Sequence, residues 1–180
     1  MSAADEIVSI VDADDNIVDQ VPRHVMRARG LTHRVTYIFV FDRDGRVFLQ
    51  QRTREKDLYP GYYDAAAGGV VVVGECYEGS AIREAEEELG IRGVPLKAHF
   101  KMFFEQDNNS CWGMVYSCIY DGPFTLQPEE VANGEFVPVE KILSGEISPI
   151  TPDTKAALEH YLQQVGTPAG RQSSSNVTRS

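Results

Sequence analysis

The chain has little positive charge and no long apolar run. Its 180 residues hold 17 Lys and Arg against 27 Asp and Glu, a net charge of −10, which excludes the basic face that general nucleic-acid binding needs. No apolar run approaches the ~18 residues of a membrane span, and the acidic amino-terminal residues lack the apolar core of a secretion signal. We therefore expect a cytoplasmic protein without a membrane or general nucleic-acid partner, and the composition leaves its oligomeric state open.

Cysteine is also scarce. Cys76, Cys111 and Cys118 are odd in number and lack the spacing of metal ligands, so we expect reduced thiols in a cytosolic protein. The remaining composition, 42% hydrophobic and 24% charged, is ordinary for a globular chain. A length of 180 residues is enough for one domain with a sizeable core.

Acidic residues are concentrated in one predicted helix, in the segment that contains Ala81, Ala85 and Leu89. Ala81, Ala85 and Leu89 recur at i, i+4 and i+8 and give this helix an apolar face. Gly90 follows, at a position typical of a helix end. The sequence therefore predicts an amphipathic helix that stops before Gly90.

Three carboxylates share another face of this helix. At 100° per residue, Glu84, Glu87 and Glu88 fall within an arc of about 100°, where they repel one another by a few tenths of a kcal/mol per pair. Such oxygen ligands suit Mg²⁺ first and Mn²⁺ second, and a bound cation would reconcile an acidic protein with an anionic, phosphorylated substrate. The alternative is an ordinary solvated acidic face, which Glu-rich helices commonly present.

The full spacing favours the metal site. Gly69 is followed after five residues by Glu75, and after seven more by the run Arg83-Glu84-Ala-Glu-Glu87-Glu88-Leu-Gly90-Ile91. This pattern is the Nudix box, and its seven fixed residues match by chance at on the order of 10⁻⁹ per starting point. The chain therefore resembles Nudix proteins, which implies an α+β fold, an α/β/α sandwich with a mixed central β-sheet.

The resemblance also implies the roles of the box residues. Glu84, Glu87 and Glu88 would bind Mg²⁺ or Mn²⁺ together with a main-chain oxygen of Gly68 or Gly69. Glu75 and Arg83 would pair and support the box, as would Gly69 and Gly90. For the base, Glu84 or Glu87 could position the water, and Glu130, on a polar loop ahead of Phe136, is a further candidate as base or extra ligand. The sequence does not decide among these three, and an exposed loop acid remains the alternative for Glu130.

Basic residues are few near this acidic helix. The loop that begins at Arg52 brings Arg52, Arg54 and Lys56 together, and loops held by a scaffold commonly carry function. We expect at least one of them, or Arg34 at the start of a predicted strand, to contact phosphate. His33 is the most interesting of the four histidines, although a single histidine is usually structural.

The remaining patterns predict the order of elements. Before the box we expect a hairpin over 6–19, a short helix over 22–29 and a second hairpin of 34–41 and 46–51. After it we expect strands at 94–104 and 111–120, a polar loop over 127–134 and a strand at 136–137. A helical turn over 139–143 and a helix from 152 to 164 complete the order. Residues 1–30 would belong to the same domain as the Nudix region, 31–165, and 166–180 would form a disordered tail. Trp112 and Tyr116 would pack in the core or stack on a base.

The resemblance implies a Mg²⁺-dependent hydrolase of a small-molecule diphosphate, such as a nucleoside diphosphate linked to another moiety. The segments 31–34 and 56–64 and the amino-terminal extension are similar to the bacterial YfcD-type subgroup, which is related to isopentenyl-diphosphate isomerase. An isomerase is therefore one alternative, but it needs a cysteine followed by Gly-His where this chain has Ala65-Ala66-Ala67-Gly68-Gly69. The other is a non-catalytic nucleotide-binding module, for which a broken acidic triad would be expected. The substrate itself is not determined by the sequence.

Overall fold

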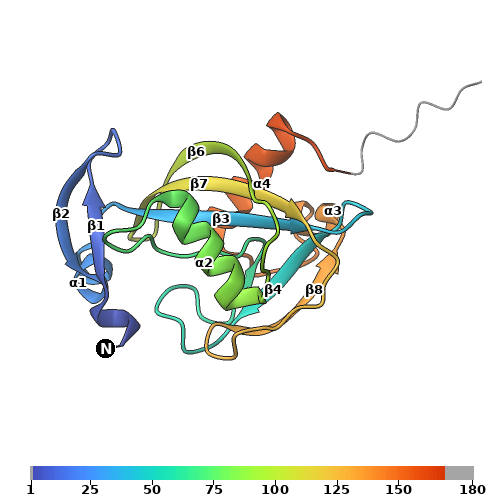
Figure 1. Cartoon of the computed structure of the whole chain (residues 1–180), viewed down its shortest axis with the longest axis horizontal. Helices are drawn as coiled ribbons and strands as arrows, with labels where there is room; N and C mark the ends of the chain where they lie inside the picture. The colour runs from blue at the N-terminus through green and yellow to red at the C-terminus, as the bar shows by residue number, and fades with distance from the viewer. Residues whose placement is uncertain (1, 169–180) are drawn as a thin grey trace, which may run out of the picture.

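A mixed β-sheet lies between helices in the computed structural model, which describes residues 2–168 (Figure 1). Its strands are β1 (Ile7–Val11), β2 (Ile17–Pro22), β3 (His33–Phe41), β4 (Val47–Arg52), β5 (Tyr63–Asp64), β6 (Lys97–Gln106), β7 (Asn109–Ile119) and β8 (Val131–Val137). The helices are the 3₁₀ turn η1 (Ala3–Asp5), α1 (Arg23–Arg29), α2 (Tyr77–Leu89), α3 (Val139–Leu143) and α4 (Pro152–Gln164). No helix in this part of the chain is long and apolar enough to cross a membrane.

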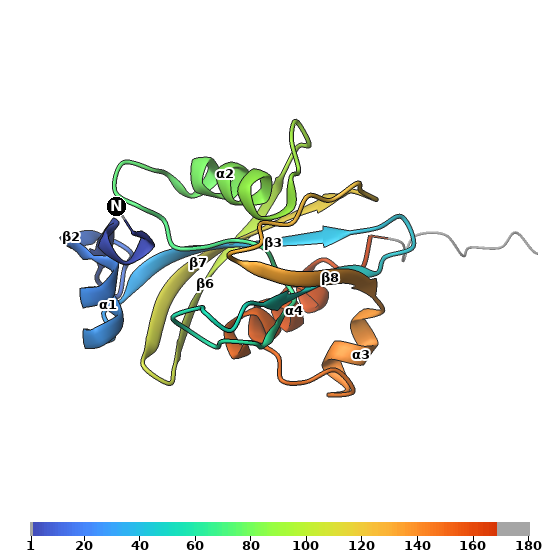
Figure 2. The same ribbon diagram turned by 90° about the horizontal axis from the view of Figure 1, so that it is seen from below.

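The parallel pairing of β3 with β7 makes the sheet mixed. These strands run side by side from the pair His33–Cys111 to the pair Phe41–Ile119. The other pairings between the named strands are antiparallel. Figure 2 shows α2 on one side of β3 and β7, with α4 on the other. The predicted α+β sandwich with a mixed sheet is therefore confirmed.

Each face of the sheet has its own core because side chains alternate along β3. Phe39 and Phe41 point toward α4, where Tyr161 stacks on Phe41 with ring centroids 5.4 Å apart. Ile38 points the other way and packs against Ala85 and the rest of the apolar face of α2. This burial fixes the orientation of α2 and therefore decides which face carries its carboxylates.

The predicted second hairpin is present, but its ladder is short. β3 and β4 are antiparallel and pair at Phe41 and Val47, across a turn in which the Asp42 amide donates to the Arg46 carbonyl at 2.9 Å. Beyond that pair they diverge, since β3 joins the distant β7 and β4 pairs along its length with β8. The predicted loop over 127–134 needs correction: β8 begins within it, at Val131, because its first residues pair with the end of β4.

The amino-terminal segment folds back beside the sheet (Figure 1). β1 pairs with β2 as predicted and also touches β3 at the pair Ile10–His33. α1 ends at Gly30, whose φ of 60° is left-handed, a conformation that glycine adopts without strain. The predicted tail lies mostly outside the described residues, which end at 168.

Candidate metal and phosphate site

Helix α2 is fixed at both ends. At its amino end, the Cys76 sulfur accepts a hydrogen bond from the Gly79 amide at 3.3 Å. At the carboxyl end Gly90 has a φ of 71°, and a Cβ there would lie 2.9 Å from the Thr125 Cβ. Only glycine fits both constraints, so the predicted supporting role of Gly90 has a physical basis.

The carboxylates of α2 line a cavity of about 160 Å³, which we call the box cavity. Residues from five separate parts of the chain surround it: Ala3 and Glu6, Arg23, Lys56 with Gly68 and Gly69, Arg83, Glu84, Glu87 and Glu88 of α2, and Gln127 with Glu130. The structure thus brings Glu130 to the three box glutamates, which lie more than forty residues earlier in the chain.

Arg83 holds the acidic side chains in place. It donates from Nε to Glu75 Oε1 at 2.5 Å and from Nη2 to Glu75 Oε2 at 3.1 Å, a two-point contact. Its Nη1 lies 3.1 Å from Glu84 Oε1 and 3.0 Å from Glu87 Oε2. The Glu75 carboxylate, by its hydrogen bonds, raises the pKa of Arg83. The expected pair of Glu75 and Arg83 is therefore present.

Glu88 is the most buried of the three glutamates, with 6% of its surface exposed. Its Oε2 accepts hydrogen bonds from Gln50 Nε2 and from the Gly68 amide, both at 3.3 Å. Burial raises the pKa of Glu88, and the nearby Glu84 carboxylate raises it further. Burial likewise raises the pKa of Glu84, against the lowering effect of Arg83. Both acids are poorly solvated, and the nearby Arg83 offsets only part of this cost at Glu84.

The carbonyl oxygens of Gly68 and Gly69 differ in whether they accept a hydrogen bond. The Gly69 carbonyl accepts the Thr36 amide at 3.0 Å, whereas the Gly68 carbonyl accepts no hydrogen bond from any described residue. A Cβ on Gly69 would lie 2.7 Å from Glu84 Oε1, and one on Gly68 would lie 2.0 Å from the Thr36 carbonyl oxygen. Backbone therefore requires glycine at Gly68, whereas a side chain on Gly69 would displace the Glu84 carboxylate. Gly68 also offers the oxygen that a cation could use.

The donor set fits a hard divalent cation. Carboxylates and one free carbonyl are the oxygen ligands that Mg²⁺ and Mn²⁺ take. In residues 2–168 no three Asp, Glu, His or Cys side chains are already grouped closely enough to hold a metal ion. Arg83 pairs with Glu84 and Glu87, and Lys56 pairs with Glu130. A bound cation would share these carboxylates with their basic partners.

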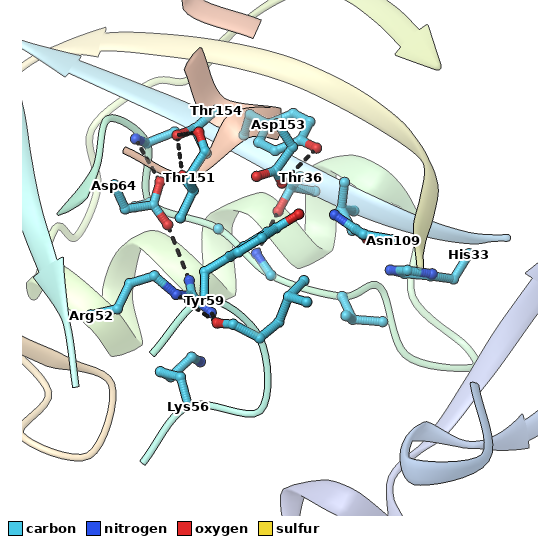
Figure 3. A pocket seen from close by; sticks show the side chains of 18 of the residues that line it. His33, Thr36, Arg52, Lys56, Tyr59, Asp64, Asn109, Thr151, Asp153 and Thr154 are labelled. Atoms are coloured by element: carbon cyan, nitrogen blue, oxygen red, sulfur yellow. Dashed lines mark hydrogen bonds and ion pairs between the residues drawn. The ribbon is translucent and has the colours of Figure 1, made fainter. Parts of the chain in front are cut away.

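A second cavity, of about 70 Å³, adjoins the first, and we call it the inner cavity (Figure 3). Four residues line both: Arg23, Lys56, Gly68 and Gly69. Figure 3 shows His33 and Asn109 at one end of the inner cavity, with Arg52 and Asp64 at the other. The two cavities therefore meet along the Gly68–Gly69 backbone, between Arg23 and Lys56.

Two of the predicted phosphate-binding residues, Lys56 and Arg52, line the inner cavity. Lys56 forms an ion pair with Glu130 and faces both cavities. Arg52 donates to the Leu58 carbonyl at 3.1 and 2.8 Å and to Asp64 at 3.1 Å, so its guanidinium is largely used within the protein.

The other two predicted phosphate-binding residues lie elsewhere. Arg34 donates to Asp15 Oδ1 at 2.8 Å and to the Asp15 carbonyl at 2.6 Å, and it lines neither cavity. Arg54 is exposed and borders a separate depression beside Pro60. The expectation that these arginines contact phosphate is not supported, because the loop and the start of β3 turn them away from the box.

Sequence reasoning missed two arginines of the amino-terminal extension. Arg23 and Arg27 lie on one face of α1, four residues apart, and both line the inner cavity. Their Nε atoms donate to the same Asp57 oxygen, at 3.3 and 3.1 Å. The i, i+4 spacing of two arginines on a short helix was the available signal, but only the tertiary fold places that helix near the box.

The aromatic candidates take structural positions. Tyr116 is 4% exposed and packs in the core beneath α2. Trp112 lies against Phe103, with ring centroids 5.5 Å apart, and under Lys101 Nζ at 5.9 Å. Neither lines the box cavity or the inner cavity, which favours packing over base stacking for both.

The fold and the box together define the class of protein. The NUDIX domain family matches residues 31–161. The chain therefore belongs to the Nudix hydrolase family, and the glutamates of α2 are those of its box.

Individual relatives support this assignment. An uncharacterised Nudix hydrolase of Yersinia pestis is 47% identical over 161 residues, which are 89% of this chain and 88% of the relative. The uncharacterised Nudix hydrolase YfcD of Escherichia coli is 43% identical over 90% of this chain and 89% of its own. This confirms the similarity to YfcD-type proteins. The crystal structure of DR0079 from Deinococcus radiodurans matches with a TM-score of 0.76 and 25% identity, covering 86% of this chain and 98% of that one.

Proposed function

We propose that this protein is a Mg²⁺-dependent pyrophosphohydrolase that cleaves the diphosphate linkage of a nucleoside diphosphate or a similar diphosphate joined to another moiety. One observation carries the proposal: Glu84, Glu87, Glu88, Glu130 and the free Gly68 carbonyl converge on one cavity that also contains Lys56 and Arg23. Oxygen ligands on one side and cations on the other suit a metal-bound diphosphate.

Glu84, Glu87, Glu88 and the Gly68 carbonyl are the proposed ligands of the cation. When bound, a divalent cation would neutralise phosphate charge and lower the pKa of an attacking water. Glu84, Glu87 or Glu130 would act as the general base that accepts the proton of that water. Lys56 and Arg23, at the junction of the two cavities, bind the phosphate oxygens and orient the diphosphate. Arg83 and Glu75 keep the glutamates in place.

The isomerase alternative has less support. The segment Ala65–Ala67 is buried, with each residue at most 4% exposed, and carries no nucleophile. None of the described cysteines lines the inner cavity or the box cavity. A covalent or acid–base role for a thiol near the box therefore has no candidate in residues 2–168.

The test is phosphorus NMR of the purified protein with Mg²⁺ and a panel of diphosphates that includes dinucleotides, sugar nucleotides, coenzyme A and isopentenyl diphosphate. We expect one diphosphate signal to be replaced by two monophosphate signals, only when Mg²⁺ is present. A Glu87→Gln protein should lose this conversion. Rearrangement of isopentenyl diphosphate, or binding without cleavage across the panel, would contradict the proposal.

A matched control is available on the same helix. Glu86 is exposed, pairs with Arg92 at 3.1 Å and does not line the box cavity. Glu86→Gln removes one carboxylate from α2, as Glu87→Gln does, and should leave hydrolysis unchanged. A loss of activity in both variants would point to a general effect on the helix.

A further inference from the structure

Two buried polar atoms that face the inner cavity have no hydrogen-bond partner among the described residues. They are His33 Nε2 and the Tyr59 hydroxyl. His33 is 1% exposed, so bulk water does not solvate its ring. A buried polar atom without a partner destabilises the fold, and two such atoms on one cavity indicate that a ligand supplies the missing hydrogen bonds.

The partner that His33 needs can be worked out from its other nitrogen. His33 Nδ1 lies 2.9 Å from the Leu31 carbonyl oxygen, which can only accept, so Nδ1 carries the hydrogen. Burial lowers the pKa of His33 to about 3, so the ring is neutral at physiological pH. Nε2 therefore presents a lone pair to the cavity and requires a hydrogen-bond donor from the ligand.

A second acceptor lines the same cavity. The Asp153 carboxylate accepts a hydrogen bond from the Tyr37 hydroxyl at 3.0 Å, and the residue is half-buried. Burial raises the pKa of Asp153 to about 6, so the group is mostly ionised at pH 7. Ionised carboxylates only accept hydrogen bonds. Asp153 and His33 thus both call for donors such as hydroxyl groups.

The junction between the inner cavity and the box cavity presents hydrogen-bond donors instead of acceptors. Arg23 and Arg27 share a single Asp57 oxygen through their Nε atoms, and their terminal nitrogens have no hydrogen-bond partner among the described residues. Their side chains are 17% and 19% exposed. Two guanidinium groups held by one carboxylate leave unused donors where the two cavities meet, and such donors suit phosphate oxygens.

We infer that the inner cavity binds a small polyhydroxylated group, similar to a sugar ring, whose attached phosphates extend past Arg23 and Arg27 toward the box cavity. This inference rests on the proposed function for the position of the diphosphate. At roughly 10–15 Å³ for each water-sized group, the cavity volume of about 70 Å³ accommodates about five to seven such groups. That size suits a sugar ring and is too small for a purine base.

The same chemistry disfavours an isoprenoid group. An apolar five-carbon tail would fill the space but would leave His33 Nε2 and the Tyr59 hydroxyl without partners and would cover the Asp153 charge. Sites built with buried polar groups strongly reject ligands that lack the matching group. Discrimination should therefore appear in binding as well as in turnover.

The experiment compares three probes on the full chain: 5-phosphoribose 1-diphosphate, isopentenyl diphosphate and inorganic pyrophosphate. The first two both carry a diphosphate on five carbons, and the first adds hydroxyl groups and a 5-phosphate, so the His33 signal and the Tyr59→Phe variant report on the hydroxyl groups separately. Calorimetry should give a dissociation constant at least about tenfold lower for the hydroxylated probe. In protein labelled with ¹⁵N-histidine, that probe alone should shift the His33 Nε2 resonance, since only it brings a donor to the lone pair.

Tyr59→Phe is the matched variant because it removes one hydroxyl and keeps the ring. It should weaken binding of the phosphoribose probe by about tenfold and leave the pyrophosphate constant unchanged. Equal binding of the two five-carbon probes, or no movement of the His33 resonance, would overturn the inference. The outcome is separable from the proposed function: selective binding without any hydrolysis would remove the hydrolase proposal alone, and hydrolysis without selectivity would remove this inference alone.

Discussion

The two cavities are separated by one strip of backbone and have opposite chemistry. The box cavity gathers carboxylates from α2 and Glu130, whereas the inner cavity presents buried acceptors that face Arg52, Arg23 and Arg27. A protein with a net charge of −10 thus places its basic groups where the two cavities meet. The difference teaches that overall charge says little about a site, because a few cations at one junction decide where an anion can bind.

Glu88 in the box cavity and Asp153 in the inner cavity illustrate the difference between the two cavities. Burial raises the pKa of both Glu88 and Asp153. In the box cavity the Glu84 carboxylate raises the pKa of Glu88 further, whereas in the inner cavity Asp64 raises that of Asp153 and the Tyr37 hydroxyl, which donates to Asp153, lowers it. A cation would relieve the first arrangement, and a neutral donor would relieve the second. The predictions below test this division, from the largest expected effect to the smallest.

The largest effect is expected from Glu84→Gln. This change keeps the shape of the side chain and removes one proposed ligand charge, so kcat should fall by roughly 10²–10³-fold. The free energy of unfolding should not fall, since the substitution relieves a buried charge. Rates with Mg²⁺ and urea denaturation of wild-type, Glu84→Gln and Glu86→Gln proteins would check both points. An activity close to wild type in Glu84→Gln would contradict the assignment.

Asp153→Asn should stabilise the protein in a pH-dependent way. The folded pKa is about 6, above the ordinary value of 3.8. Between these values the unfolded state releases a proton that the folded state keeps, so stability falls as pH rises from about 4 to about 6, and the cost remains above that range. The full cost is roughly 3 kcal/mol, of which we expect the variant to recover about 1–3 kcal/mol at pH 7.5 and little at pH 4.

Urea denaturation at the two pH values is the measurement. Asp14→Asn is the control, since Asp14 lies exposed in the turn between β1 and β2. A gain for Asp153→Asn that is the same at both pH values would mean that burial of charge is not its cause.

Arg23→Gln should weaken substrate binding without changing the metal site. Loss of one charged hydrogen-bond donor to phosphate costs about 1.5–3 kcal/mol, so KM should rise by about ten- to a hundredfold while kcat changes less. Steady-state kinetics on the substrate found by phosphorus NMR would separate the two constants. A fall in kcat at constant KM would instead place Arg23 with the catalytic groups.

The smallest effects are expected for the arginines that the fold turns away. Arg54→Gln should leave KM within about twofold of wild type, because Arg54 lies outside both cavities. Arg34→Gln should also leave KM unchanged but lower the unfolding free energy by about 1–3 kcal/mol, since it removes a partner of the buried Asp15. A rise in KM for either variant would indicate that the substituted arginine contacts the phosphate after all.

Helices and short-range residue pairs could be predicted from local sequence patterns, whereas contacts between segments far apart in the chain could not. The α2 helix and its end at Gly90 follow from periodicity and glycine chemistry, and Glu75 meets Arg83 because the box spacing fixes both. The hairpin of β3 and β4 is shorter than the pattern suggested because β3 finds its main partner in β7, 78 residues further along the chain. Arg23 was missed for the same reason, since no local signal shows that α1 packs beside the box.

The most direct test of the central claim is Mn²⁺ binding followed by electron paramagnetic resonance. We predict that wild-type protein binds Mn²⁺ and that a diphosphate tightens this binding. Glu84→Gln and Glu88→Gln should weaken it strongly, while Glu86→Gln and Asp153→Asn should leave it unchanged. Equal Mn²⁺ binding in all of these proteins would contradict the assignment of the box cavity as the metal site.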